Sequence, residues 1–154
     1  MQIKSNALLT IEPIGDNQKS VFTAWDKGKN LFLSGSAGTG KTFILLYLAL
    51  KDVLDSSTPY DKVILVRSLL ASRDIGFLPG TLEEKSNLYQ DPYRILVRYL
   101  FQCESDQEFS QLYDKLVTQG SLEFYSTSFL RGQTFDRSVI IVDEASNMIF
   151  QELD

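Results

Sequence analysis

The sequence predicts an α/β fold built around a mainly parallel β-sheet. Two observations carry this expectation. Short apolar, β-branched runs alternate with longer amphipathic stretches, and a glycine-rich loop joins one apolar run to the stretch that follows it. The chain has 154 residues, 44% of them hydrophobic, which is enough to bury a core. No repeat or long linker divides it, so we expect residues 1–154 to form a single domain.

The N-terminal half contains two expected helices and two expected strands. Residues 16–28 begin at a capping aspartate, carry apolar side chains at helical spacing and end at a glycine. Residues 31–33 are a short apolar strand that runs into the glycine-rich loop. Residues 41–54 are apolar on nearly all sides, which predicts a buried helix. Residues 62–67 are a continuous β-branched run, typical of a parallel strand covered on both faces.

The C-terminal half repeats the alternation. Thr81 has capping-box spacing to Glu84 and begins a short helix, and Asp91 begins another whose apolar face includes Tyr93. Ser105 and Glu108 form a second capping box for a helix that ends at a glycine. Two further strands are expected, at residues 122–125 and 138–142.

The glycine-rich loop is the strongest chemical signal. Its residues match G-x-x-x-x-G-K-[S/T] throughout, the Walker A pattern or P-loop (residues 35–42): Gly35, Ser36, Ala37, Gly38, Thr39, Gly40, Lys41 and Thr42. Glycines let backbone N–H groups approach phosphate oxygens, and the following helix adds its positive N-terminus. Lys41 would neutralise the β- and γ-phosphates, and the Thr42 hydroxyl would ligate Mg²⁺. The alternative is a glycine-rich turn with a chance lysine.

A second signal is the pair of acids that ends the apolar run 138–142. This pair resembles the Walker B segment of nucleotide hydrolases, in which Asp143 would hold Mg²⁺ through water and Glu144 would polarise the attacking water. The alternative is a strand end with solvated acids, or a helix cap. An adjacent Asp and Glu favour hydrolysis of the γ-phosphate over its transfer to a small-molecule hydroxyl.

Gln18 is a third candidate. It precedes Lys41 by about 23 residues, a placement that resembles the adenine-reading glutamine of helicase-type ATPases. In that role it would favour ATP over GTP. The alternative is an ordinary glutamine on a capped surface helix.

Composition removes several function classes. There are no histidines, which excludes most zinc, Ser-His and Cys-His chemistries. The net charge of −5 argues against binding nucleic acid by bulk electrostatics, although a local basic strip is compatible with it. Arg67 and Arg131 are the candidate nucleic-acid contacts, and the alternative is that they are solvated charges. The single Cys103, the lack of a membrane-length apolar run and the lack of a secretory signal predict a cytoplasmic protein without a membrane partner.

The chain resembles the PhoH family of ATPases, which are RecA-like proteins related to the cores of superfamily 1 helicases. The blocks that carry the resemblance are Asp-Asn-Gln-Lys at 16–19, Ala-Gly-Thr-Gly-Lys-Thr at 37–42, Gly-Phe-Leu-Pro-Gly at 76–80, Leu-Glu-Glu-Lys at 82–85, Arg-Gly-Gln-Thr at 131–134 and Ile-Val-Asp-Glu-Ala at 141–145. The resemblance implies a three-layer α/β/α P-loop NTPase fold. It also implies Mg²⁺-dependent ATP hydrolysis, coupling to RNA or single-stranded DNA, and homo-oligomeric rings in the complete fold.

Departures from the family pattern leave alternatives open. Ser146 stands where the family has a glutamine, and Ser68 where it has a proline. In RecA-like sheets another strand follows the Asp-Glu segment, so we expect a fold that is incomplete at its C-terminus, as in a truncated, phage-type member acting in the host cytoplasm. The alternative functions are a nucleotide-binding module without turnover and, less favoured, a P-loop kinase.

Overall fold

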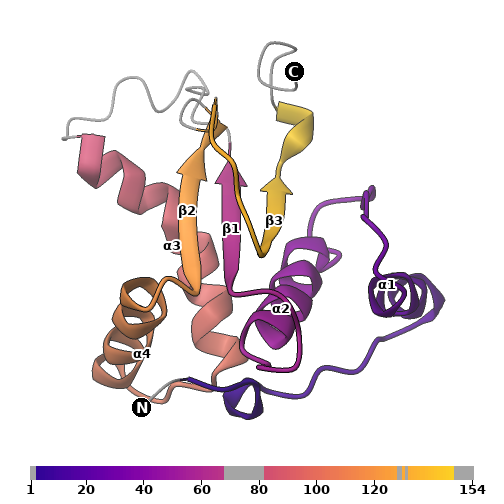
Figure 1. The fold of residues 1–154 in the computed structure, drawn as a ribbon, viewed down its shortest axis with the longest axis horizontal. Helices are drawn as coiled ribbons and strands as arrows, with labels where there is room; N and C mark the ends of the chain where they lie inside the picture. Colours follow the sequence, from indigo (N-terminus) through magenta and orange to yellow (C-terminus); the bar gives the residue numbers. More distant parts are fainter. Residues whose placement is uncertain (1–2, 68–81, 128–129, 131, 148–154) are drawn as a thin grey trace.

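The computed structural model describes residues 3–67, 82–127, 130 and 132–147. Its elements in chain order are η1 (Ser5–Ala7), α1 (Asp16–Asp26), α2 (Lys41–Val53), β1 (Lys62–Arg67), α3 (Leu82–Leu100), α4 (Asp106–Thr118), β2 (Leu122–Ser126), β3 (Ser138–Asp143) and η3 (Ala145–Asn147) (Figure 1). In the part of the chain that is described, no helix combines the length and the apolar character needed to cross a membrane.

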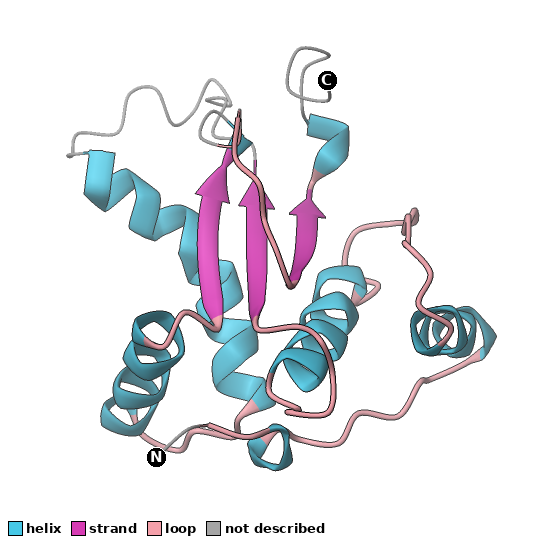
Figure 2. Cartoon of the chain, viewed as in Figure 1, coloured by secondary structure: helices cyan, strands magenta, loops and turns pink. Residues whose placement is uncertain are grey.

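The three strands form one parallel sheet in the order β2-β1-β3. Val63 of β1 pairs with Leu122 of β2 on one side and with Val139 of β3 on the other. Figure 2 shows the three arrows pointing the same way with helices beside the sheet. Parallel neighbours require crossover connections, and α3 (Leu82–Leu100) and α4 (Asp106–Thr118) lie in the connection from β1 to β2. The predicted α/β fold with a parallel sheet is therefore confirmed, and it is consistent with a P-loop NTPase.

The core lies between the sheet and helices α2, α3 and α4. The apolar sequence of α2 is explained by its position, because Leu46, Leu50 and most of its other side chains are buried. They share one cluster with Val97 of α3, Leu116 of α4 and the sheet residues that face the helices. A helix that is apolar on nearly all sides can be stable only in such a place.

One predicted strand is wrong. Residues 31–33 form no ladder, although Leu31 and Leu33 are partly buried and Phe32 is 88% exposed. This alternation is typical of a strand, but a strand also needs a neighbour to accept its backbone hydrogen bonds. None of the three described strands pairs with this segment. The alternation of partly buried and exposed side chains was thus typical of a strand, but it does not determine whether a neighbouring strand is present.

The predicted boundary at Asp91 is also wrong. A single helix, α3, runs from Leu82 to Leu100 and keeps Pro92 inside it. Proline removes one backbone donor and crowds the preceding turn, yet burial of Tyr93, Val97 and Leu100 on one face outweighs that local cost. The capping box of α4 is confirmed, since the Ser105 hydroxyl accepts the Glu108 N–H at 3.1 Å. The Thr81 cap, the block at 76–80 and Ser68 lie outside the described residues.

The core predicts a sharp contrast between two truncations. Leu46→Ala removes a side chain with no exposed surface and should lower the free energy of unfolding by about 2–5 kcal/mol. Val117→Ala removes a half-exposed side chain from α4 and should change it by less than about 0.5 kcal/mol. Urea unfolding followed by circular dichroism measures both. Equal losses would contradict the assignment of α2 to the centre of the core.

Candidate functional site at the P-loop and the end of β3

The P-loop winds onto the N-terminus of α2. Gly40 is the residue before the helix, and Gly38 and Gly40 have φ of 75° and 79°. A Cβ on either glycine would meet no other protein atom within 4 Å, so within the protein the requirement for glycine is one of backbone conformation. A residue with a side chain adopts this left-handed backbone conformation at a cost of roughly 1–2 kcal/mol. The sequence thus places glycine where the turn demands it, directly before the N–H groups of the first helical turn.

The Lys41 side chain folds back over the loop that precedes it. Its Nζ donates to the Gly35 carbonyl at 2.8 Å, to the Ser36 carbonyl at 2.6 Å and to the Thr39 hydroxyl at 3.3 Å. These contacts hold the Lys41 ammonium against the loop and link the two ends of residues 35–41. The acceptors are neutral, so an anion seated in the loop would bind the ammonium more strongly than they do.

Thr42 and Asp143 are 101 positions apart and meet directly. The Thr42 Oγ1 donates to Asp143 Oδ1 at 3.0 Å. Hydroxyl and carboxylate oxygens suit Mg²⁺, which keeps several waters and takes further ligands from substrate phosphates. The donor set therefore fits that cation, with Thr42 and Asp143 as the residues that would hold it. Among the described residues no group of three or more His, Cys, Asp or Glu side chains gathers into an all-protein metal site.

Asp143 has two further donors. The Tyr93 hydroxyl donates to Asp143 Oδ2 at 2.8 Å, and the Glu144 backbone N–H donates to Oδ1 at 3.0 Å. Tyr93 is 2% exposed, and its ring lies 5.8 Å from that of Phe124. Burial, and then the charge of Asp143 and its hydrogen bond, raise the pKa of the Tyr93 phenol well above its usual value. Helical spacing indicated an apolar position here, and it gave no sign that the hydroxyl reaches Asp143.

Glu144 is held by backbone and side chain together. Its φ of 52° is left-handed, and its carboxylate accepts from Arg67 Nη2 at 2.8 Å. Arg67 stands opposite Asp143 in the parallel register, which explains why it reaches the next residue. Burial alone would lower the pKa of the Arg67 guanidinium, but the bond to Glu144 and the surrounding negative groups raise it. The proposed nucleic-acid contact thus lies against the candidate general base.

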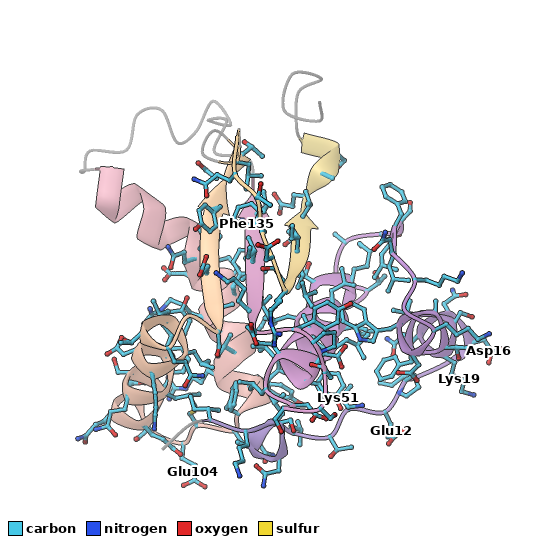
Figure 3. All side chains as sticks on the ribbon, in the orientation of Figure 1. Glu12, Asp16, Lys19, Lys51, Glu104 and Phe135 are labelled. Carbon is cyan, nitrogen blue, oxygen red and sulfur yellow. The ribbon has the colours of Figure 1, made fainter. Side chains whose placement is uncertain are left out.

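Lys41, Thr42, Asp143 and Glu144 line one cleft of about 1370 Å³. It is lined by the P-loop, by Asp143 and Glu144, and by the facing surfaces of β3 and residues 30–34. The structure therefore brings Asp143 and Glu144 to the same cleft as the predicted P-loop, of which all residues but Ser36 line it. In Figure 3, Phe135 of the segment between β2 and β3 lies over the sheet, with its ring 5.4 Å from that of Tyr125.

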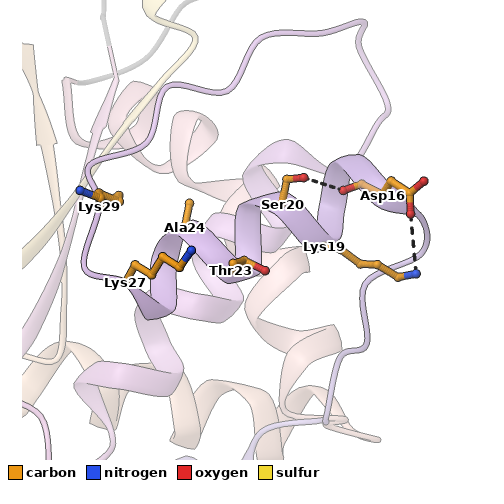
Figure 4. Close-up of a pocket in the computed structure, with 7 residues that line it drawn as sticks. All are labelled: Asp16, Lys19, Ser20, Thr23, Ala24, Lys27 and Lys29. Atoms are coloured by element: carbon orange, nitrogen blue, oxygen red, sulfur yellow. Dashed lines mark hydrogen bonds and ion pairs between the residues drawn. The ribbon is translucent and has the colours of Figure 1, made fainter.

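A separate hollow of about 470 Å³ runs along α1 (Figure 4). Lys19, Lys27 and Lys29 border it, and Lys19 lies 3.7 Å from the Asp16 carboxylate. Lys29 also borders the large cleft, whereas the lysine and the acids of the predicted site line only the cleft. The hollow is thus distinct from the phosphate site.

Gln18 does not line the cleft that holds the P-loop. The Gln18 Oε1 accepts the backbone N–H of Ile14 at 2.7 Å, a contact that fixes the entry to α1. Its adenine-reading role stays a prediction. Arg131 lies outside the described residues, so its predicted contact with nucleic acid also stays untested.

The comparisons with known proteins agree on one family. Residues 10–154 match the family described as PhoH-like protein. A PhoH-like protein of Mycobacterium leprae is 34% identical over 145 residues, which cover 94% of this chain and 39% of that protein. Protein PhoH of Escherichia coli K12 is 37% identical over 77% of this chain and 32% of its own length, and Protein PhoH2 of Bacillus subtilis is 32% identical over 79% and 27%.

The chain spans about two fifths of the length of the mycobacterial relative. The matched region includes both the P-loop and the end of β3, so the residues of the site fall inside the shared part. The chain belongs to the PhoH-like protein family, a family of P-loop ATPases.

Proposed function

We propose that the chain binds ATP with Mg²⁺ and hydrolyses its γ-phosphate. The observation that supports this most directly is the 3.0 Å contact between Thr42 and Asp143, which joins the P-loop to the end of β3. A phosphate cradle alone would suit many nucleotide enzymes. A cradle joined to a carboxylate pair at a strand end is suited to holding a metal and a water beside the same phosphate.

Each residue has a distinct role in this proposal. The P-loop N–H groups and Lys41 bind the β- and γ-phosphates, and Lys41 exchanges its loop carbonyls for phosphate oxygens. Thr42 and Asp143 hold Mg²⁺, which when bound neutralises charge on the phosphates. Glu144 orients the attacking water and accepts its proton. For this last role Glu144 must exchange its bond to Arg67 for a bond to water.

Nucleotide binding without turnover is the second candidate, and one specific observation favours it. The Glu144 carboxylate is engaged by Arg67 at 2.8 Å, and the backbone at Glu144 is left-handed. If this pair persists with ATP bound, the general base stays occupied. Phosphate release from a chain that binds ATP separates the two candidates.

Nucleic-acid coupling is the further part of the proposal. We propose that RNA or single-stranded DNA meets the sheet end, with Arg67 and Arg131 as its contacts. A phosphate that draws Arg67 away from Glu144 would free the carboxylate, so this geometry supports a link between polymer binding and hydrolysis. We place this activity in the cytoplasm, and we propose that assembly of the complete fold into homo-oligomeric rings would add an arginine from a neighbouring subunit.

Lys41→Ala should weaken binding of Mg²⁺–ATP by about 10- to 100-fold, because charge-assisted contacts contribute about 1.5–3 kcal/mol. Titration calorimetry measures the affinity. Lys51→Ala is the matched control, since it removes an exposed lysine from the last turn of the same helix. Equal affinities in the two variants would reject the phosphate role of Lys41.

Glu144→Gln should retain Mg²⁺–ATP binding and lower the rate of phosphate release by about 10²- to 10⁴-fold, the usual contribution of a general base. A coupled phosphate assay follows the rate, and exposed Glu12→Gln is the control. A variant as active as the wild type would remove Glu144 from the mechanism. Binding without release in the wild type would instead establish the second candidate.

Gln18→Ala should reduce the preference for ATP over GTP, because the amide that would pair with adenine is lost. The ratio of the two dissociation constants is the measurement. Asn17→Ala, one residue away on the same exposed turn, controls for effects on the start of α1. A ratio unchanged by Gln18→Ala would leave Gln18 with only its contact to Ile14.

A further inference from the structure

The Asp143 carboxylate is fixed from three directions. Thr42 of α2 and the Glu144 N–H bond to Oδ1, and Tyr93 of α3 bonds to Oδ2. Tyr93 is the one donor among these that belongs neither to the P-loop nor to the end of β3. It is supplied by a different helix, and nothing in the pattern around it indicates nucleotide chemistry.

The Tyr93 contact adds a restraint on the Asp143 carboxylate at its second oxygen. The terminal torsion of an aspartate is broad, so hydrogen bonds at one oxygen restrain the plane of the group less tightly than bonds at both oxygens. A donor on Oδ2 fixes the plane of the group and keeps Oδ1 directed toward Thr42. That orientation is the one in which the hydroxyl and the carboxylate present their oxygens to a common cation.

The chemistry of the donor also matters. A lysine or arginine on Oδ2 would cancel the charge that attracts a metal, whereas a phenol orients the carboxylate and leaves its charge intact. The ring of Tyr93 is buried against Phe124, so its position is set by the core and not by solvent. The hydroxyl is therefore held at a fixed distance from β3.

We propose that Tyr93 is a positioning residue for the magnesium site, which orients Asp143 through Oδ2 so that Oδ1 and the Thr42 hydroxyl face one Mg²⁺. The inference rests on the proposed function, since it assumes that ATP binds with Mg²⁺ in the cleft. It assigns to α3 a direct part in metal affinity. A purely structural hydroxyl would contribute to folding and leave the metal dependence of binding unchanged.

The test is the Mg²⁺ dependence of ATP binding in the wild type, Tyr93→Phe and Tyr47→Phe. Tyr47 is also buried, at 5% exposure, and lies against Phe22, so the control removes the same atom away from the site. ATP affinity is titrated at a series of Mg²⁺ concentrations and in excess EDTA. Thermal unfolding without nucleotide verifies that each variant is folded.

Tyr93→Phe should raise the Mg²⁺ concentration for half-maximal effect by about tenfold, the lower end of the range for partners of metal ligands. Affinity in EDTA should stay at the wild-type value, and Tyr47→Phe should match the wild type throughout. An unchanged Mg²⁺ midpoint in folded Tyr93→Phe, or an equal loss with and without Mg²⁺, would overturn the inference while the proposed function stands.

A double variant keeps the test decisive. In an Asp143→Asn background the oriented charge is gone, so adding Tyr93→Phe should cause no further shift in the Mg²⁺ midpoint. An additive shift would show that Tyr93 acts by another route and would overturn the inference. A wild type that binds no ATP at any Mg²⁺ concentration would instead reject the proposed function, and the inference with it.

Discussion

The parallel pairing of β1 with β3 is the constraint on which the site depends. Parallel strands finish at the same edge of a sheet, so the register that sets Leu65 beside Ile141 also sets Arg67 beside Asp143. Helix α2 packs beneath that edge and presents its first turn to the same place. Residues far apart in the chain meet because two strands end and one helix begins at the same edge of the sheet. No long loop is needed to carry them there.

Among the described residues, acidic and basic side chains occur in equal number at this edge of the sheet. Two acids, Asp143 and Glu144, follow each other at the strand end and line the cleft with Lys41, while Arg67 contacts Glu144 from the neighbouring strand. Only Arg67 and Glu144 form an ion pair among the contacts described there, while Lys41 is bound by neutral carbonyls and Asp143 by neutral donors. The Asp143 carboxylate, whose charge a metal ion would neutralise, and the Lys41 ammonium, whose charge a triphosphate would neutralise, are thus not paired with each other.

Sequence reasoning found the parts of the site that local chemistry determines. A loop that needs left-handed backbone and a lysine must lie in consecutive residues, and so must an apolar strand that ends in acids. The structure accordingly has the glycine loop directly before α2 and the two acids at the end of β3, as the sequence predicted. Tyr93 and the Arg67–Glu144 pair were missed because they depend on which helix face and which register the fold selects. The strand expected at residues 31–33 failed for a related reason, since period-two alternation indicates a surface but not a partner.

The outer edge of β3 has a consequence for how the protein behaves in solution. Ile140 and Val142 are about half exposed there, Phe32 is exposed nearby, and none of the described strands covers the far side of β3. Sheet edges with apolar side chains favour association between chains, which like charge on every molecule opposes. The sequence pI is about 4.8. Near that pH the repulsion vanishes while the apolar edge remains, so colloidal stability should be lowest in mildly acidic buffer.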